Sequence, residues 1–220
     1  MRFLVREQGY ERAVASGQLR YSRDGAPTGI VESWRLNEAV QGYRVLRVDL
    51  DGRAAGADSL LLHLLLDPAG QPERLTFRAW AADGGKLEGN LFFDADQLVC
   101  GRTRDGERLP DVHLPRPEPL RWWYPAGTGL AAFAELTAGT HELIYLDPDA
   151  DFAPRPVLVS VGAVATDGLD WRDRPVPAQK RTISWAQQTR TIWFDEHNWP
   201  RRINAGAWQA DEVRYVRRNN

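Results

Sequence analysis

Glycine and proline recur along this chain at intervals too short to leave room for ordinary helices. The 220 residues contain 19 glycines and 14 prolines, which divide the sequence into segments of strand length. Between these breaks apolar residues alternate with polar ones, as at Leu46, Val48 and Leu50. A period of two is typical of a strand with one buried face. The spacing therefore predicts an all-β fold.

Asp-Gly and Gly-Gly pairs mark the predicted turns. The pairs Asp24-Gly25, Asp51-Gly52, Gly84-Gly85 and Asp105-Gly106 supply the positive φ angles of tight hairpins, so sequential strands should be antiparallel neighbours. The predicted strands are Gln18–Ser22, Gly29–Leu36, Tyr43–Leu50, Leu60–Leu66, Arg74–Ala82, Lys86–Phe93, Leu98–Arg104, Glu142–Leu146, Val157–Thr166, Arg181–Gln187, Thr191–Phe194, Arg202–Ala205 and Glu212–Val216. Because strand twist accumulates, we expect a large curved antiparallel sheet or incomplete barrel of about 11–13 strands.

Two stretches depart from the strand pattern. Residues 110–125 combine several prolines with the run RWWY at 121–124, and we expect an extended, irregular lid or connector there. Because Trp122 and Trp123 are neighbours on an extended chain, their side chains should point to opposite sides. The sequence LAAFAEL predicts one short helix at 130–136, ending near Gly139.

One hairpin motif occurs twice in the sequence. The pattern D-x-x-[GN]-x-P-x-R-[LI] fits residues 67–75 and again residues 195–203. Alternatively, the two matches are a coincidence, because only a few residue types suit tight turns. We interpret the motif as a repeated unit, which predicts a single domain over residues 1–220 with two related half-sheets. These would span about 1–110 and 126–220, joined by the segment 110–125.

Charge and composition limit the partners. The 28 basic and 30 acidic residues give a formal charge of −2, without the basic footprint of a nucleic-acid binder. Cys100 is the single cysteine, so no internal disulfide forms. The stretch Met1–Tyr10 does not have the form of a secretory signal, which predicts a cytoplasmic protein. Since no apolar stretch approaches about 20 residues, an integral membrane protein is not expected. The oligomeric state stays open.

The sequence predicts no catalytic constellation, no cofactor and no metal site. Asp147, Asp149 and Asp151 alternate like the start of a calcium loop, but Phe152 and Leu158 occupy the positions where that loop needs Gly and Glu. The four histidines are scattered, and none has the spacing of paired metal ligands.

Aromatic residues supply the candidate ligand contacts. Nine tryptophans could line an apolar cleft, with His63 as a polar anchor within the apolar run Leu60–Leu66. Alternatively, they fill the core of a wide sheet. The candidate ligand-binding residues are Trp80, Trp122, Trp123, Tyr124, Trp185, Trp193 and His63.

The last third of the chain resembles a group of uncharacterised bacterial proteins. The resemblance rests on PAQKRTISW at 177–185, on TIWFD at 191–195 and on the turn that leads to Pro200. That group is similar to the bacterial lipoprotein carriers, whose curved, incomplete barrel holds acyl chains in an apolar concavity. The resemblance implies the fold, and binding of lipid follows by analogy.

Three functions remain open at this point. The first is a non-catalytic binder or carrier of an apolar or amphipathic, lipid-like small molecule in the concave face of the sheet. The second is a cofactor-free enzyme that uses a buried acid or base in the same cavity, with Glu32, His63 and Glu88 as candidates. The third is an interaction module that docks a protein through Trp122 and Trp123.

Overall fold

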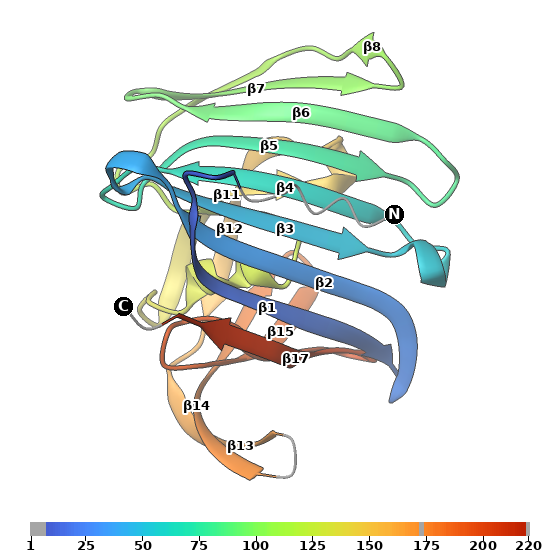
Figure 1. Cartoon of the computed structure of the whole chain (residues 1–220), viewed down its shortest axis with the longest axis vertical. Coiled ribbons are helices and arrows are strands. Elements are labelled where there is room, and N and C mark those ends of the chain that lie inside the picture. Colours follow the sequence, from blue (N-terminus) through green and yellow to red (C-terminus); the bar gives the residue numbers. More distant parts are fainter. Residues whose placement is uncertain (1–7, 172–173, 219–220) are drawn as a thin grey trace. The chain divides into compact units, whose positions relative to one another are not determined.

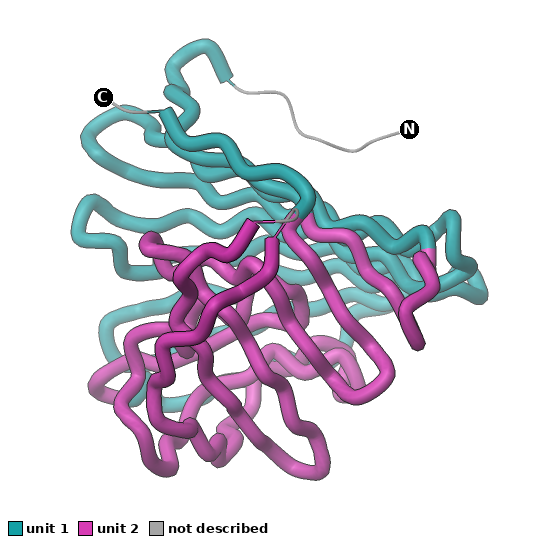
Figure 2. The backbone as a smooth tube through the Cα atoms, turned by 90° about the horizontal axis from the view of Figure 1, so that it is seen from below, with its two compact units in different colours: residues 1–18, 29–117, 213–220 teal, residues 19–28, 118–212 magenta. Residues whose placement is uncertain are grey.

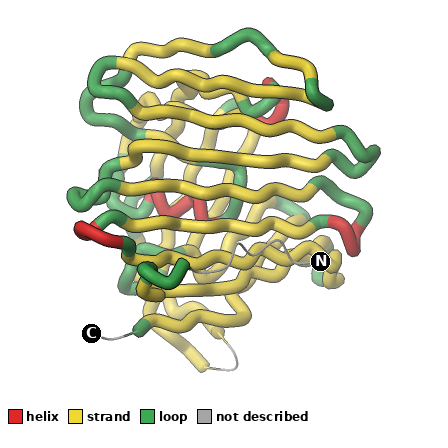
Figure 3. The backbone as a smooth tube through the Cα atoms, turned by 45° about the horizontal axis from the view of Figure 1, so that its top comes forward, coloured by secondary structure: helices red, strands yellow, loops and turns green. Residues whose placement is uncertain are grey.

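A computed structural model describes residues 8–171 and 174–218 of the chain, and strands dominate it (Figures 1 and 3). The strands are β1 (Arg12–Arg23), β2 (Ala26–Glu38), β3 (Arg44–Asp51), β4 (Ser59–Leu66), β5 (Pro72–Trp80), β6 (Lys86–Phe93), β7 (Gln97–Arg104), β8 (Glu107–Arg108), β9 (Val112–Pro115), β10 (Trp122–Trp123), β11 (Gly139–Asp147), β12 (Ala153–Val161), β13 (Ala165–Trp171), β14 (Arg174–Trp185), β15 (Gln188–Phe194), β16 (Pro200–Ala205) and β17 (Trp208–Arg217). Short 3-10 helices occur at η1 (Val40–Gly42), η2 (Arg53–Ala55), η3 (Thr128–Phe133) and η4 (Pro148–Ala150).

Hydrogen bonds join the 17 described strands into one sheet, in which β1 pairs with both β2 and β17. The chain forms two compact units, coloured separately in Figure 2. Unit 1 comprises residues 1–18, 29–117 and 213–220, and unit 2 comprises residues 19–28 and 118–212. The strands β1, β2 and β17 therefore each contribute residues to both units.

Unit 1 is an antiparallel meander from β2 to β7, and β9 returns to pair with β7. The alternation seen in the sequence gives this sheet one apolar face. A row of directly paired, buried residues crosses five strands on that face: Leu46, Leu64, Leu75, Leu91 and Cys100. Burying such a row of apolar side chains is the main stabilising contribution of this face.

The other face of unit 1 carries a buried ion pair. Arg47 Nη1 and Nη2 each donate to a different carboxylate oxygen of Glu11, both at 2.6 Å. The Asn37 amide adds a third hydrogen bond to Glu11, at 2.7 Å. The hydrogen bonds from Arg47 lower the pKa of the Glu11 carboxyl. These hydrogen bonds hold Glu11, the residue that precedes β1, against the sheet.

Unit 2 contains the meander β14–β15–β16–β17, the paired strands β11 and β12, and the hairpin β13–β14. β10 pairs with β11 in parallel. An aromatic-rich cluster forms its core, in which Trp123, Phe133, Trp185 and Phe194 are buried with aliphatic residues of several strands. The Trp123 ring stacks on Tyr145, with ring centroids 4.4 Å apart.

The two copies of the hairpin motif adopt the same geometry. In β4–β5, Asp67 N–H donates to Gln71 C=O at 2.9 Å, and the strand register shifts just before the turn. In β15–β16, Asp195 N–H donates to Trp199 C=O at 2.9 Å, with a corresponding register shift. The fourth residue of each motif has positive φ, 85° at Gly70 and 67° at Asn198. A relation between the two half-sheets stays a prediction.

The all-β fold class with a large antiparallel sheet is confirmed. The sheet has 17 described strands in place of the predicted 11–13, and some other elements also differ from the prediction. The helical segment is a 3-10 helix at Thr128–Phe133, two residues earlier than expected. Its first turn is closed by the bonds from Gly129 N–H to Ala126 C=O at 3.0 Å and from Leu130 N–H to Gly127 C=O at 3.1 Å, and Gly129 lies against the Tyr124 carbonyl, where a Cβ atom would come within 2.2 Å. Residues 110–125 are not wholly irregular, since they include β9 and β10.

Candidate functional site: a polar groove in unit 2

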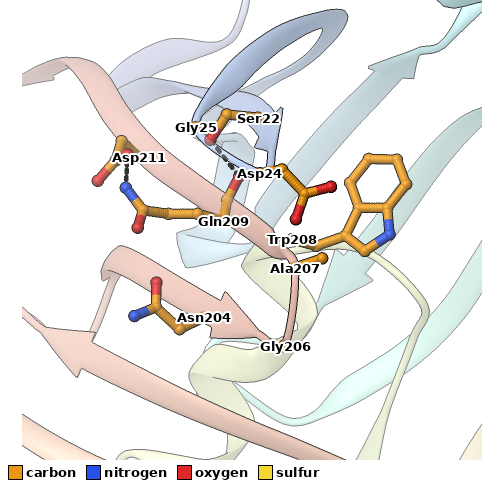
Figure 4. A pocket seen from close by; sticks show the side chains of 9 residues that line it. All are labelled: Ser22, Asp24, Gly25, Asn204, Gly206, Ala207, Trp208, Gln209 and Asp211. Atoms are coloured by element: carbon orange, nitrogen blue, oxygen red, sulfur yellow. Dashed lines mark hydrogen bonds between the residues drawn. The ribbon is translucent and has the colours of Figure 1, made fainter.

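Two turns of unit 2 form a groove of about 510 Å³ (Figure 4). One turn joins β1 to β2 through Asp24 and Gly25, whose φ angles of 50° and 78° match the Asp-Gly hairpin signal. The other joins β16 to β17 at Gly206. Asp24 N–H donates to Ala207 C=O at 2.8 Å, which joins the turns. The lining residues are Ser22, Asp24, Gly25, Asn204, Gly206, Ala207, Trp208, Gln209 and Asp211.

Strand pairing places the polar lining on one face. Asn204 of β16 pairs directly with Gln209 of β17, and Arg202 pairs with Asp211. Because direct partners in an antiparallel ladder project to the same side, these four side chains form two adjacent polar pairs. The Asn204 row continues across β15 through Thr191. The register of β16 and β17 therefore places Asn204, Gln209 and Asp211 on one side of the groove.

The groove offers both acceptors and donors, since Asp24 and Asp211 are carboxylates and Asn204, Gln209 and Ser22 also carry N–H or O–H groups. Asp211 accepts from Arg202 Nε at 2.6 Å and from Gln209 Nε2 at 2.5 Å. The Asp24 side chain is 76% exposed, with Arg23 Nε 4.0 Å from its carboxylate. Asn204 Oδ1 is buried and finds no donor within residues 8–171 and 174–218. Because this oxygen is shielded from solvent, a molecule in the groove does not reach it in this conformation.

Trp208 gives the groove an aromatic wall. Its side chain belongs to the exposed large apolar residues, at 37% exposure. The Arg23 guanidinium lies 5.5 Å from the centroid of the ring. This distance is within the range of a cation–π interaction, so Arg23 is already a cation partner of the indole.

None of the residues predicted as ligand contacts lines this groove. Trp123 and Trp185 lie in the core cluster of unit 2. Tyr124 is buried, and its hydroxyl donates to Thr128 Oγ1 at 3.3 Å. Trp122 is half-buried, with its ring centroid 5.8 Å from that of Tyr124. Their role as ligand contacts stays a prediction.

The remaining predicted contacts lie on strand faces. Trp193 is half-buried on β15, where Lys180 Nζ lies 5.2 Å from the centroid of its ring. Trp80 is half-buried at the end of β5 in unit 1. His63, also in unit 1, pairs across the sheet with Arg47 and Thr76. Each of these three residues is placed by a different strand.

The three candidate acids or bases, Glu32, His63 and Glu88, lie in different surroundings. Burial and the nearby Arg47 lower the pKa of His63 to about 4, so the imidazole is neutral at pH 7. Glu32 is fully buried. Glu88 is paired with Arg78 at 2.8 Å and with Lys86 at 2.9 Å. The sheet does not pair His63 with either glutamate.

Sequence reasoning missed the groove residues because they are far apart in the chain. The sequence signal for one of these turns was the Asp24-Gly25 pair, but nothing in the sequence placed it beside the turn at Gly206.

Within the described ranges, no three His, Cys, Asp or Glu side chains gather as a metal site. No helix in the described part of the chain combines the length and the apolar composition needed to cross a membrane.

Comparison with known proteins supports the fold. No protein-family model matches the sequence, and no curated protein matches it. Among solved structures, the chain is similar to a β-barrel-like protein of the domain of unknown function DUF1849 from Brucella abortus. The two share 10% sequence identity with a TM-score of 0.59, over 94% of this chain and 98% of that chain. The resemblance to uncharacterised β-barrel-like proteins is thereby supported, and the resemblance to lipoprotein carriers stays a prediction.

Proposed function

We propose that this protein is a non-catalytic binding protein that holds a small polar molecule in the groove of unit 2. The observation that carries the proposal is the groove itself, which is lined by the carboxylate, amide and hydroxyl groups of Asp24, Asp211, Asn204, Gln209 and Ser22. The volume of about 510 Å³ also falls within the range of about 300–1,000 Å³ typical of small-molecule sites.

A ligand screen observed by NMR tests this proposal without assuming the ligand. The indole N–H groups of the tryptophans give separate signals in a ¹H–¹⁵N spectrum, and the Trp208→Phe variant identifies that of Trp208. A ligand in the groove should shift the signals of Trp208, Gly25 and Gly206, and leave the Trp193 indole unchanged. A polar library that shifts none of the groove signals would refute the proposal.

An apolar ligand is the second candidate, as the sequence analysis expected. It rests on the resemblance to the lipoprotein carriers. The apolar row Leu46, Leu64, Leu75, Leu91 and Cys100 is already buried in the described chain, so an acyl chain would need the segments that cover this row to move aside. Native mass spectrometry of gently purified protein, together with displacement of a fluorescent fatty acid, tests this candidate. Absence of both a copurified lipid and displacement would exclude it.

A further inference from the structure

We infer that unit 2 has a second binding site, centred on Arg190, that takes the carboxylate group of an organic anion. The inference goes beyond the groove, because the strand register puts Arg190 on the other face of β15. Three observations support it: a guanidinium without an acidic partner, a hydroxyl group that is open to a ligand, and aromatic rings that position both groups.

The strand register places Arg190 at the margin of the core of unit 2. Arg190 of β15 pairs directly with Ile183 of β14, and Ile183 and Ile192 both belong to the core cluster. Alternate residues of a strand share a face, so Arg190 points to the same side as Ile192. Thr191, which pairs with Asn204 of the groove, points to the opposite side. The two sites therefore lie on different faces of the sheet.

The guanidinium of Arg190 has only neutral partners in the described chain. Its Nη2 donates to Gln188 Oε1 at 3.0 Å, and its Nη1 donates to Thr189 C=O at 3.5 Å. No carboxylate within residues 8–171 and 174–218 forms an ion pair with it. Arg47 and Arg202, by contrast, each bind a carboxylate at 2.6 Å. A guanidinium carries five N–H donors, so most of those of Arg190 remain for a ligand.

Burial makes the unpaired charge of Arg190 costly. The side chain is half-buried, and desolvation lowers the pKa of its guanidinium. A bound anion would offset this cost, because it restores the interactions that burial removes. Arg190 Nε makes no hydrogen bond in the described chain, yet it is not among the atoms shielded from solvent. An anion can therefore reach the guanidinium in this conformation.

The Tyr145 hydroxyl adds a neutral donor beside the guanidinium. Arg190 lies within electrostatic range of Tyr145 and of Tyr21. Within the described ranges Tyr145 Oη makes no hydrogen bond, and it is not among the atoms shielded from solvent. Burial raises the pKa of the Tyr145 phenol, so the hydroxyl is protonated at pH 7 and can donate to an oxyanion.

Aromatic rings position these two groups. The Arg190 guanidinium lies 5.5 Å from the centroid of the Trp185 ring. The centroids of Trp185 and Trp123 are 5.9 Å apart, and Trp123 stacks on Tyr145 at 4.4 Å. The contact with Trp185 does not exclude an anion, because a stacked guanidinium keeps its N–H groups in its own plane, where a carboxylate binds them. The rings thus form a connected support for both donors.

The charge of the site favours a carboxylate over a phosphate. Arg190 supplies one positive charge and a planar fork of N–H groups, which match the single charge and the two oxygen atoms of a carboxylate. A phosphate monoester carries about 1.5 to 2 negative charges at pH 7. Asp147 and Asp149 lie within electrostatic range of Tyr145. Although Arg155 pairs with Asp147 at 2.5 Å, Asp149 would repel the additional charge of a phosphate.

Isothermal titration calorimetry of the full chain with sodium benzoate at pH 7 tests the inference. Benzamide is the control ligand, because it has nearly the same shape and no charge. We expect saturable binding of benzoate and at least about 10-fold weaker binding of benzamide, since hydrogen bonds between charged groups are the stronger ones. Sodium phosphate, the competing anion, should bind more weakly than benzoate.

Variants locate the site. Arg190→Gln should weaken benzoate binding about 10-fold or more, and Tyr145→Phe should weaken it about 3-fold. Arg190→Lys keeps the charge but not the fork, so its affinity should be intermediate. The matched control is Arg23→Gln. Arg23 also lies 5.5 Å from the centroid of a tryptophan ring, but its side chain is 62% exposed, and benzoate affinity should stay unchanged.

Several results would overturn the inference. Absence of benzoate binding, or equal affinity for benzoate and benzamide, would show that the site does not recognise a carboxylate, and tighter binding of phosphate would refute the ligand class. Undiminished affinity in a folded Arg190→Gln variant would place the site elsewhere. If that variant does not fold, unchanged affinity in both Arg190→Lys and Tyr145→Phe has the same meaning. Benzoate should leave the Trp208 indole signal unchanged, which keeps this test independent of the groove.

Discussion

The buried ion pair of unit 1 leads to a quantitative stability prediction. The Glu11 and Arg47 side chains are only 2% and 8% exposed, and they share two hydrogen bonds of 2.6 Å. The substitution Arg47→Met removes the cation and leaves the carboxylate buried. Breaking a buried pair in this way costs about 3–5 kcal/mol, because the remaining charge stays desolvated. We expect that loss in the free energy of unfolding, measured by urea titration at pH 7.

An exposed pair in the same sheet provides the matched control. Arg78 and Glu88 lie 2.8 Å apart, but their side chains are 56% and 37% exposed. Arg78→Met should therefore cost less than about 1 kcal/mol. Replacing both buried partners, as in Glu11→Leu with Arg47→Met, should recover most of the loss, since no charge is left buried. Equal costs for the two single arginine variants would refute the reasoning that burial sets the penalty.

The pH dependence of the Arg47→Met variant gives a further check. In the wild type, the hydrogen bonds from Arg47 lower the pKa of Glu11. Without Arg47, burial favours the protonated carboxyl, so Glu11 should bind a proton at higher pH in the folded variant. The destabilisation caused by the substitution should consequently become smaller between pH 7 and pH 5. A destabilisation that stays constant over this interval would show that the lost free energy comes from packing rather than from charge.

Three further predictions concern single positions. The pKa of His63 is lowered from 6.5 to about 4, so the unfolded chain binds this proton more tightly and stability should fall by at most about 3 kcal/mol from pH 6.5 to pH 4. Urea midpoints should show a weaker fall over this range in His63→Gln, and an identical fall would contradict the prediction. In Gly89→Ala the added Cβ would lie 2.3 Å from the Phe77 ring, so thermal unfolding should show a loss of about 1–3 kcal/mol; an unchanged Tm would count against this. Asp195→Ala removes the acceptor of the Trp199 N–H bond of 2.8 Å, and a loss of about 1–3 kcal/mol in urea is expected; wild-type stability would show that the carboxylate is dispensable.

Local sequence signals predicted many of the strands and hairpins, but Gly52 has a φ of −98° where the Asp51-Gly52 pair predicted a positive angle. The alternation at Leu46, Val48 and Leu50 falls within β3, where Leu46 and Val48 are buried. The pair Asp105-Gly106 has the two positive φ angles that a tight turn requires, 50° and 90°. These properties depend on the conformational preferences of neighbouring residues, and the sequence contains that information directly.

The candidate site could not be predicted because it depends on contacts between distant segments. The bond between Asp24 N–H and Ala207 C=O joins turns that are far apart in sequence. Similarly, the burial of Trp123 but not of Trp122 depends on which strand pairs with β10. The alternation of side chains along a strand predicts that Trp122 and Trp123 point in opposite directions, but it does not predict which of the two faces the core.

The sharing of β1, β2 and β17 between the units has a consequence for biosynthesis. The carboxyl-terminal strand closes on the amino-terminal one, since Arg218 N–H donates to Val14 C=O at 3.0 Å. A ribosome delivers β17 after the other 16 described strands, so neither unit has all of its residues before β17 emerges. Domains made of contiguous sequence can fold one after another as they emerge. The strands β1 and β2 must instead wait for β17 as their neighbour in the sheet, and no contiguous gene fragment encodes either unit alone.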